Sequence, residues 1–175
     1  MSAQTSSATG PTAAGESVSR FRAATNADRQ DLYGLLALCF AEYPGCYVDP
    51  HEDLEDLQAP GQSFATKGGA LWVVEDERGR VSACIAIDYP EPDTGELHRL
   101  YVRPDQRRRG LGRALILLAE DHARSRGATR IVFWSDTRFT DAHALYERLG
   151  YRRVGGTRDL GDISNSVEYR FEKEL

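Results

Sequence analysis

The stretch that decides the fold is Leu100-Tyr101-Val102-Arg103-Pro104-Asp105-Gln106-Arg107-Arg108-Arg109-Gly110-Leu111-Gly112-Arg113-Ala114. An apolar strand runs into a proline and a basic segment, and two glycines then open a long amphipathic helix. The first amides of a helix have no partner within the helix, and the helix dipole adds positive charge there. Glycine lets the backbone approach a ligand without a Cβ in the way. Further positive charge comes from Arg107, Arg108, Arg109 and Arg113. The sequence therefore predicts a phosphate-binding loop.

Two other phosphate-binding loops fit this stretch poorly. A dinucleotide-binding fingerprint reads Gly-x-Gly-x-x-Gly/Ala, but its third small residue falls on Leu115, and the acidic ribose ligand expected about 20 residues on falls on Arg130. A Walker loop needs Gly-Lys-Ser/Thr, and the two lysines of the chain, Lys67 and Lys173, do not follow a glycine-rich loop.

Composition narrows the class of protein. The 175 residues carry a formal net charge of −5, which argues against general nucleic-acid binding and mildly favours cationic acceptors. Cys39, Cys46 and Cys84 form no Cys-x-x-Cys pair, which favours reduced thiols in a cytoplasmic protein. The four histidines show no metal-ligand spacing, so we expect no metal. We also expect no membrane association, since the sequence has neither a spanning segment nor an apolar signal core.

Periodicity predicts one domain over residues 17–175, after a disordered tail over residues 1–16 that is rich in small and polar residues. We expect strands at 18–24, 71–75, 81–89, 96–102, 131–134, 151–155 and 167–172, with the second and third forming a hairpin. We expect helices from Thr25 to about 43, at 109–126 and at 140–149, and a short acidic helix at 51–57. Alternation along 96–102 predicts Leu97, Arg99 and Tyr101 on the face opposite Glu96, His98 and Leu100. Strand, helix and strand from 96 to 134 predict a right-handed crossover between parallel strands.

A second motif, Ala142-His143-Ala144-Leu145-Tyr146-Glu147-Arg148-Leu149-Gly150-Tyr151, supports the first. Together the two stretches resemble motifs A and B of the GNAT superfamily of N-acetyltransferases. Motif A reads Gln/Arg-x-x-Gly-x-Gly/Ala, and motif B reads Asn-x-x-Ala-x-x-x-Tyr-x-x-x-Gly-Phe/Tyr. The chain departs from motif B at Phe139, where the family has an asparagine that contacts CoA; Thr140 is the candidate replacement.

The resemblance implies an α/β (α+β) acyl-CoA N-acyltransferase fold. Its mixed, mostly antiparallel sheet has parallel, splayed fourth and fifth strands and helices on both faces. It also implies acetyl-CoA as co-substrate. The diphosphate would lie on residues 107–113, including Leu111, and the pantetheine arm along Leu100, Tyr101 and Val102, with the Leu100 amide polarising the thioester carbonyl.

The resemblance further implies catalytic roles. Tyr146 would protonate the departing thiolate. Glu96, fourteen residues before Gly110, matches a glutamate base of the family and would take the proton of the amine, directly or through water. We expect partial burial to raise the pKa of Glu96. His98, on the same predicted face, is the alternative base.

The activity implied is transfer of acetyl from acetyl-CoA to a primary amine of a small molecule by direct attack. The alternatives are a protein or peptide acetyltransferase and a non-catalytic acyl-CoA-binding regulatory module. A homodimer is expected by analogy with relatives. Candidate acceptor-side residues are Tyr43, Tyr47, Asp49, the acidic run 52–56, Asp136, Arg138 and the loop 159–166.

Overall fold

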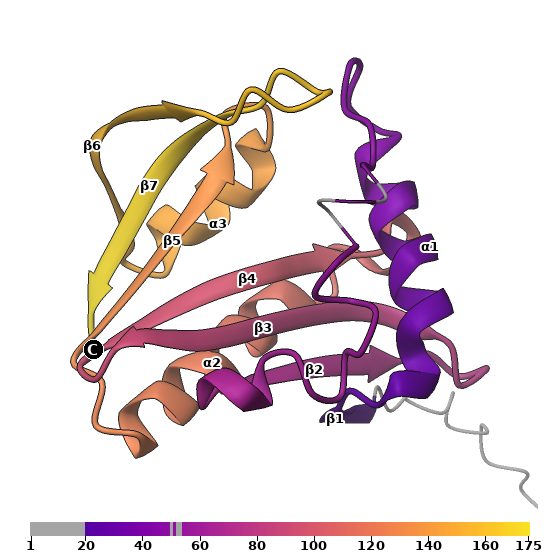
Figure 1. The fold of residues 1–175 in the computed structure, drawn as a ribbon, viewed down its shortest axis with the longest axis horizontal. Helices are drawn as coiled ribbons and strands as arrows, with labels where there is room; N and C mark the ends of the chain where they lie inside the picture. Colours follow the sequence, from indigo (N-terminus) through magenta and orange to yellow (C-terminus); the bar gives the residue numbers. More distant parts are fainter. Residues whose placement is uncertain (1–19, 50, 52–53) are drawn as a thin grey trace, which may run out of the picture.

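A seven-stranded sheet with strand order β1-β2-β3-β4-β5-β7-β6 organises the chain (Figure 1). The structure is a computed structural model that describes residues 20–49, 51 and 54–175, so the predicted tail at 1–16 lies outside the described residues. The strands are β1 (Arg20–Ala23), β2 (Ala70–Glu75), β3 (Val81–Glu91), β4 (Thr94–Val102), β5 (Arg130–Asp136), β6 (Arg152–Asp159) and β7 (Val167–Glu174). The α-helices are α1 (Arg29–Phe40), α2 (Leu111–Ser125) and α3 (Thr140–Arg148).

The predicted fold class is confirmed, including the splayed parallel strands. Neighbouring strands pair antiparallel throughout except β4 and β5, which are parallel. Their pairing covers only Thr94–Glu96 against Arg130–Val132. Beyond Glu96 the two strands separate, so β4 and β5 diverge toward their carboxyl ends.

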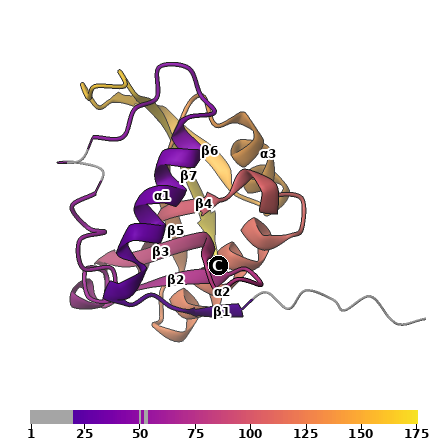
Figure 2. The ribbon, with the colours of Figure 1, turned by 90° about the vertical axis from the view of Figure 1, so that its right-hand side faces the viewer.

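Helices cover both faces of the sheet. Figures 1 and 2 show α1 on one side and α2 and α3 on the other. Each side has its own hydrophobic cluster. Leu115, Ile116 and Ala119 of α2 pack into the cluster on the α2 side, and Leu32 and Leu36 of α1 pack into the cluster on the α1 side. The loop from β4 to α2 thus connects the edge of the splay to a helix anchored in the core.

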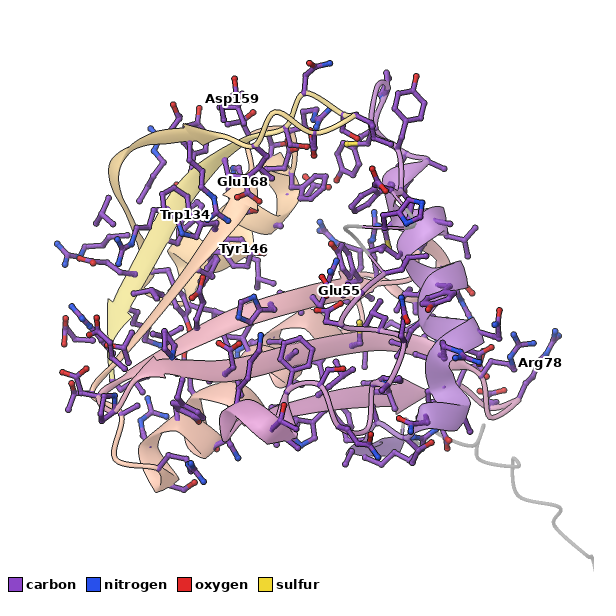
Figure 3. The ribbon with its side chains drawn as sticks, in the orientation of Figure 1. Glu55, Arg78, Trp134, Tyr146, Asp159 and Glu168 are labelled. Atoms are coloured by element: carbon purple, nitrogen blue, oxygen red, sulfur yellow. The ribbon has the colours of Figure 1, made fainter. Side chains whose placement is uncertain are left out.

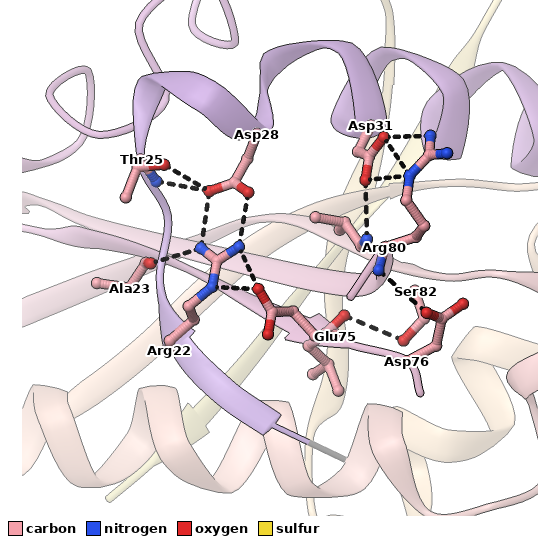
Figure 4. Close-up of polar contacts among 11 residues, drawn as sticks. Arg22, Ala23, Thr25, Asp28, Asp31, Glu75, Asp76, Arg80 and Ser82 are labelled. Carbon is pink, nitrogen blue, oxygen red and sulfur yellow. Dashed lines mark hydrogen bonds and ion pairs between the residues drawn. The ribbon is translucent and has the colours of Figure 1, made fainter. Parts of the chain in front are cut away.

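A buried ion pair fixes the start of α1. The Asp28 carboxylate accepts the backbone N–H of Thr25 at 2.7 Å, closing the capping box that the sequence suggests. The Arg22 guanidinium bonds both Asp28 oxygens, at 2.7 and 2.8 Å, and Glu75 at 2.7 Å (Figure 4). The hydrogen bond from Arg22 lowers the pKa of Asp28 despite its burial.

The predicted acidic helix at 51–57 is wrong. The described residues of this segment, 51 and 54–57, form turns and a bend, with i→i−3 bonds from Leu57 to Leu54 and from Gln58 to Glu55. A segment this short cannot offset the cost of helix nucleation. Tertiary contacts decide its path instead, because Asp56 pairs with Arg99 at 3.0 Å and Leu57 is buried.

The predicted alternation along β4 is also wrong beyond Arg99. Arg99 has a φ of 56°, and the interval from His98 to Tyr101 on β4 opposes the shorter interval from Cys84 to Ala86 on β3. This β-bulge adds one residue to β4. Leu97 and Leu100 therefore both pack toward the α2 cluster, whereas Tyr101 packs toward the α1 cluster.

Candidate functional site

The loop between β4 and α2 presents a row of backbone amides. Arg108 and Gly110 both have positive φ, 63° and 80°, which turns successive N–H groups toward one side. Within the part of the chain that the structure describes, no protein acceptor bonds the amide nitrogens of residues 108–113. The first turn of α2 therefore offers these donors, with the helix dipole behind them, to an anion.

The two glycines of this loop serve different needs. A Cβ on Gly110 would meet nothing within 4 Å, so its positive φ is what favours glycine there. A Cβ on Gly112 would come within 3.1 Å of the Leu145 side chain. Glycine at 112 therefore allows α2 and α3 to approach closely beside the loop.

A groove of about 560 Å³ runs from this loop to the splayed strands. Most of the predicted cofactor residues line it: Leu100, Tyr101, Val102, Arg107, Arg108, Gly110, Leu111, Gly112 and Arg113. Arg109 and Thr140 lie outside its lining. Arg109 lines a second groove, between α1 and the β2–β3 turn, and Thr140 is exposed at the start of α3. The sequence reasoning missed Cys39 of α1 and Asp141 and Arg148 of α3, and it assigned Tyr43, which also lines this groove, to the acceptor side. Arg148 follows Tyr146 by two positions, so the motif B helix was the available signal.

Positive charge surrounds the groove. Arg108, Arg113 and Arg148 are exposed, and none of them forms an ion pair with another residue in the described ranges. Arg107 differs, because its guanidinium pairs with Glu42 and donates to the Val102 carbonyl at 3.0 Å. In this structure the Arg107 side chain joins the loop to α1, and the other three arginines remain available to a ligand.

Glu96 and His98 lie at the opening of the splay. Glu96 is the last β4 residue paired with β5, and His98 follows two residues later. The His98 imidazole lies 3.0 Å from Asp88, whose other oxygen is 3.4 Å from the Lys67 ammonium. Burial raises the pKa of Asp88, but His98 and Lys67 outweigh it and the net shift is downward.

Asp88, Glu96 and His98 carry carboxylate and imidazole groups, which are donors that could ligate a cation. One ligand atom from each of Asp88, Glu96 and His98 lies within 4.8 Å of the others. The Asp88 carboxylate contacts both the Lys67 ammonium and the His98 imidazole. The Glu96 carboxylate therefore lies near an imidazole that Asp88 orients.

Tyr146 joins the groove to a second, smaller cleft. Its side chain is buried against the Phe133 ring, with centroids 4.6 Å apart, and it lines both cavities. Burial raises the pKa of Tyr146 to about 12, although the nearby Ser135 hydroxyl works against that shift. The smaller cleft, of about 90 Å³, lies in the splay and is also lined by His98, Trp134 and Glu168.

Phe139 stands where the family has its asparagine. Its ring packs on Tyr43 and Phe40 of α1, with centroid separations of 4.7 and 6.3 Å. At the position where the family has an asparagine side chain, Phe139 therefore makes apolar contacts between the start of α3 and the end of α1.

Several of the predicted acceptor-side residues come together from three segments: the chain after α1, the end of β5 with the residues after it, and the β6–β7 loop. The Ser164 hydroxyl accepts from the Tyr47 amide at 2.8 Å and donates to the Tyr47 carbonyl at 3.1 Å. Arg138 pairs with Asp136 at 2.6 Å and donates to the Ser164 carbonyl at 3.2 Å. The segment after α1 is thereby tied to the β6–β7 loop. Residues 52 and 53 of the acidic run lie outside the described residues.

In the described ranges, α1, α2 and α3 are all too short or too polar to cross a lipid bilayer.

Comparisons with known proteins agree with this geometry. The family model described as Acetyltransferase (GNAT) family matches residues 29–151. The mycothiol acetyltransferase of Beutenbergia cavernae is 34% identical over 131 residues, which cover 74% of this chain and 43% of that protein. The N-acetyltransferase YjgM of Escherichia coli is 34% identical over 110 residues, covering 62% of this chain and 64% of that protein. The chain thus spans less than two thirds of these curated relatives.

Solved structures share the fold. An acetyltransferase of Staphylococcus aureus superposes with a TM-score of 0.78 at 14% identity, covering 90% of this chain and 99% of that one. The yncA protein of Salmonella typhimurium, solved with its cofactor acetyl-CoA, has a TM-score of 0.70 at 19% identity, covering 90% of this chain and 94% of that one. The chain belongs to the GNAT family of acetyltransferases.

Proposed function

We propose that the protein transfers an acetyl group from acetyl-CoA to the primary amine of a small molecule. The observation that carries this proposal is the run of unbonded amides at residues 108–113, which opens onto a groove ending at the splay beside Tyr146. The residues fit the co-substrate. The amides and the helix dipole suit a diphosphate, and Arg108, Arg113 and Arg148 add positive charge for the phosphate groups of CoA.

The pantetheine arm would lie along β4. Beyond Glu96 the β5-facing edge of β4 is not paired with β5. An extended chain bearing amide groups can add to such an edge as a strand would. In this proposal Leu100, Tyr101 and Val102 bind pantetheine, and the Leu100 amide polarises the thioester carbonyl.

Proton transfer accompanies the direct attack. The amine nitrogen forms a bond to the acetyl carbon as the carbon–sulfur bond breaks. Freeing the lone pair of an alkylamine with a pKa near 10.4 costs about 4–5 kcal/mol at pH 7, which explains the need for a base. Glu96, or His98 held by Asp88, takes the proton of the amine directly or through water, and the Tyr146 hydroxyl donates a hydrogen bond to the sulfur as it gains charge.

A small-molecule acceptor is supported by two relatives. The mycothiol acetyltransferase is named for a small molecule, and so is the N-acetylaspartate synthetase of Danio rerio, which is 33% identical over 110 residues, covering 62% of this chain and 38% of that protein. A cytoplasmic location and a homodimer belong to the same proposal; the three free cysteines support the former.

An acceptor panel tests the proposal. Release of CoA thiol from acetyl-CoA is measured with free amines, amino acids, polyamines and peptides, and mass spectrometry identifies the acetylated product. Release with free small amines and not with peptides supports the proposed function. Release with peptides alone identifies a protein acetyltransferase. Tight acetyl-CoA binding with no release from any acceptor identifies a binding module.

A further inference from the structure

No helix among the described residues covers one face of the β5-β7-β6 part of the sheet, which we call the open face. The α2 and α3 helices cover its other face, where Phe133, Tyr169 and Phe171 join the core, and α1 lies over the opposite half of the sheet (Figures 1 and 2). Alternation places Trp134 of β5 with Glu168, Arg170 and Glu172 of β7 on the open face. Figure 3 shows Trp134 and Glu168 over these strands.

Arg170 is an unmatched cation on this open face. It lies directly across from Trp134 in the β5–β7 register, with its guanidinium 6.0 Å from the Trp134 ring. Its Nε is buried and has no hydrogen-bond acceptor among the residues that the structure describes. None of the described residues forms an ion pair with Arg170.

The two neighbouring carboxylates on β7 already form ion pairs with other arginines. Glu168 pairs with Arg158 at 2.7 Å, and Glu172 pairs with Arg152 at 3.3 Å. These are the acids two residues before and after Arg170 on the same strand and face. A buried, unbonded N–H of a charged group is destabilising. The described residues thus leave the Arg170 guanidinium without a counter-anion.

The position of Arg170 relates it to the proposed amine site. Glu96 pairs with Val132, two residues before Trp134, and Trp134 pairs with Arg170. From strand spacing and rise, the Cα atoms of Glu96 and Arg170 lie about 12 Å apart on the same face. Side chains stand up from a sheet, so the ends of these two side chains are separated by a gap of several ångströms. A molecule with an amine and a carboxylate a few bonds apart would fill that gap with a hydrogen bond at each end.

We propose that the acceptor is an amino acid, whose carboxylate binds Arg170 while its amine faces Glu96. This inference rests on the proposed function and deepens it. Guanidinium and carboxylate form paired, charge-assisted hydrogen bonds. Trp134, beside Arg170, lines the cleft in the splay, and the Arg158 guanidinium lies over its ring at 4.2 Å.

The experiment compares amino acids with their carboxamides, which keep the side chain and α-amine but lose the negative charge. Steady-state kcat/KM is measured for each pair with the wild-type enzyme and with Arg170→Met, Arg170→Lys and Arg153→Met. Arg153 is the matched control, because it is an exposed arginine of the adjacent strand that stacks on Tyr169 on the other face. Thermal unfolding confirms that each variant is folded.

With kcat/KM expressed for the unprotonated amine, because the carboxamide lowers the pKa of the neighbouring amine, wild-type enzyme should favour the acid over the amide by roughly 10- to 150-fold, as expected for hydrogen bonds to a charged group. The ratio should fall to about one in Arg170→Met, recover in part in Arg170→Lys and stay unchanged in Arg153→Met. Equal use of acid and amide by the wild-type enzyme overturns the inference and leaves the proposed function standing. An equal loss of kcat/KM for the acid and the amide in Arg170→Met also overturns the inference, because that result would show that Arg170 has a structural role. Failure to acetylate any amine overturns the proposed function and the inference together.

Discussion

Replacing Tyr146 by Phe removes a buried hydroxyl from a side chain that lines both cavities of the site. Burial raises the pKa of Tyr146 to about 12, whereas an ordinary thiol titrates near 8.5. Complete transfer of the proton to a free thiolate is therefore uphill by about 5 kcal/mol, at 1.36 kcal/mol for each pKa unit. The phenol acts mainly as a hydrogen-bond donor while sulfur gains charge. A hydrogen bond to a charged group contributes about 1.5–3 kcal/mol, so Tyr146→Phe should lower kcat by roughly 10- to 150-fold.

The fold should tolerate this change. The ring keeps its contacts with Phe133 and Phe171, and the lost polar contact is with the Ser135 hydroxyl. We expect the free energy of unfolding to fall by less than about 1.5 kcal/mol. Reduced activity in a variant with near wild-type urea unfolding therefore reports on catalysis.

The assay is kcat at saturating amine and acetyl-CoA between pH 7 and 10. A phenol with a pKa of about 12 stays protonated throughout that range, so the ratio of wild-type to variant kcat should be constant. An unchanged kcat refutes the role. A wild-type decline near pH 8–9 that the variant lacks would show instead that Tyr146 titrates there and that its pKa is not raised.

Two further predictions follow from named carboxylates. Glu96→Gln should lower kcat/KM at pH 7 by roughly 10²–10³-fold, within the range of acid–base groups. The loss should be smaller at pH 10, because more of the amine is then unprotonated. Equal activity of variant and wild type at pH 7 would exclude Glu96 as the base. Asp28→Asn should destabilise the fold by about 1–3 kcal/mol at pH 7, since it breaks the pair with Arg22. Because Arg22 lowers the folded pKa of Asp28, the contribution is full above the unfolded value near 3.9 and is lost as pH falls through the lowered one. Urea unfolding at pH 7 and pH 3 measures this, with exposed Asp121→Asn as control, and a gap that widens in acid would contradict the assignment.

The sequence predicted those elements whose pattern is local. Apolar runs and glycine breaks placed β2 to β5, α2 and α3 within a few residues, and the two motifs pointed to the splay between β4 and β5. The loop at residues 107–113 was predicted for the same reason, because its glycines and its helix start are adjacent in the chain.

What the sequence could not predict depends on partners that are distant in the chain. An arginine at a φ of 56° has no sequence signature, so the bulge at Arg99 and the changed face of Leu100 were missed. The acidic run near Asp56 has the composition of a helix, yet its pair with Arg99 fixes a series of turns. Arg170 is unmatched only because Arg152 and Arg158 of β6 take the neighbouring acids.

The affinity for acetyl-CoA tests the central claim most directly, measured by titration calorimetry on Gly110→Glu and Gly79→Glu. Both glycines have positive φ, 80° and 72°, and open space beside them, so both variants bear the same backbone strain and added charge. A carboxylate at 110 repels the diphosphate, and like charges brought together cost several kcal/mol. We predict at least about 100-fold weaker binding for Gly110→Glu, equivalent to about 2.7 kcal/mol, and wild-type affinity for Gly79→Glu. Wild-type affinity in Gly110→Glu would contradict the account.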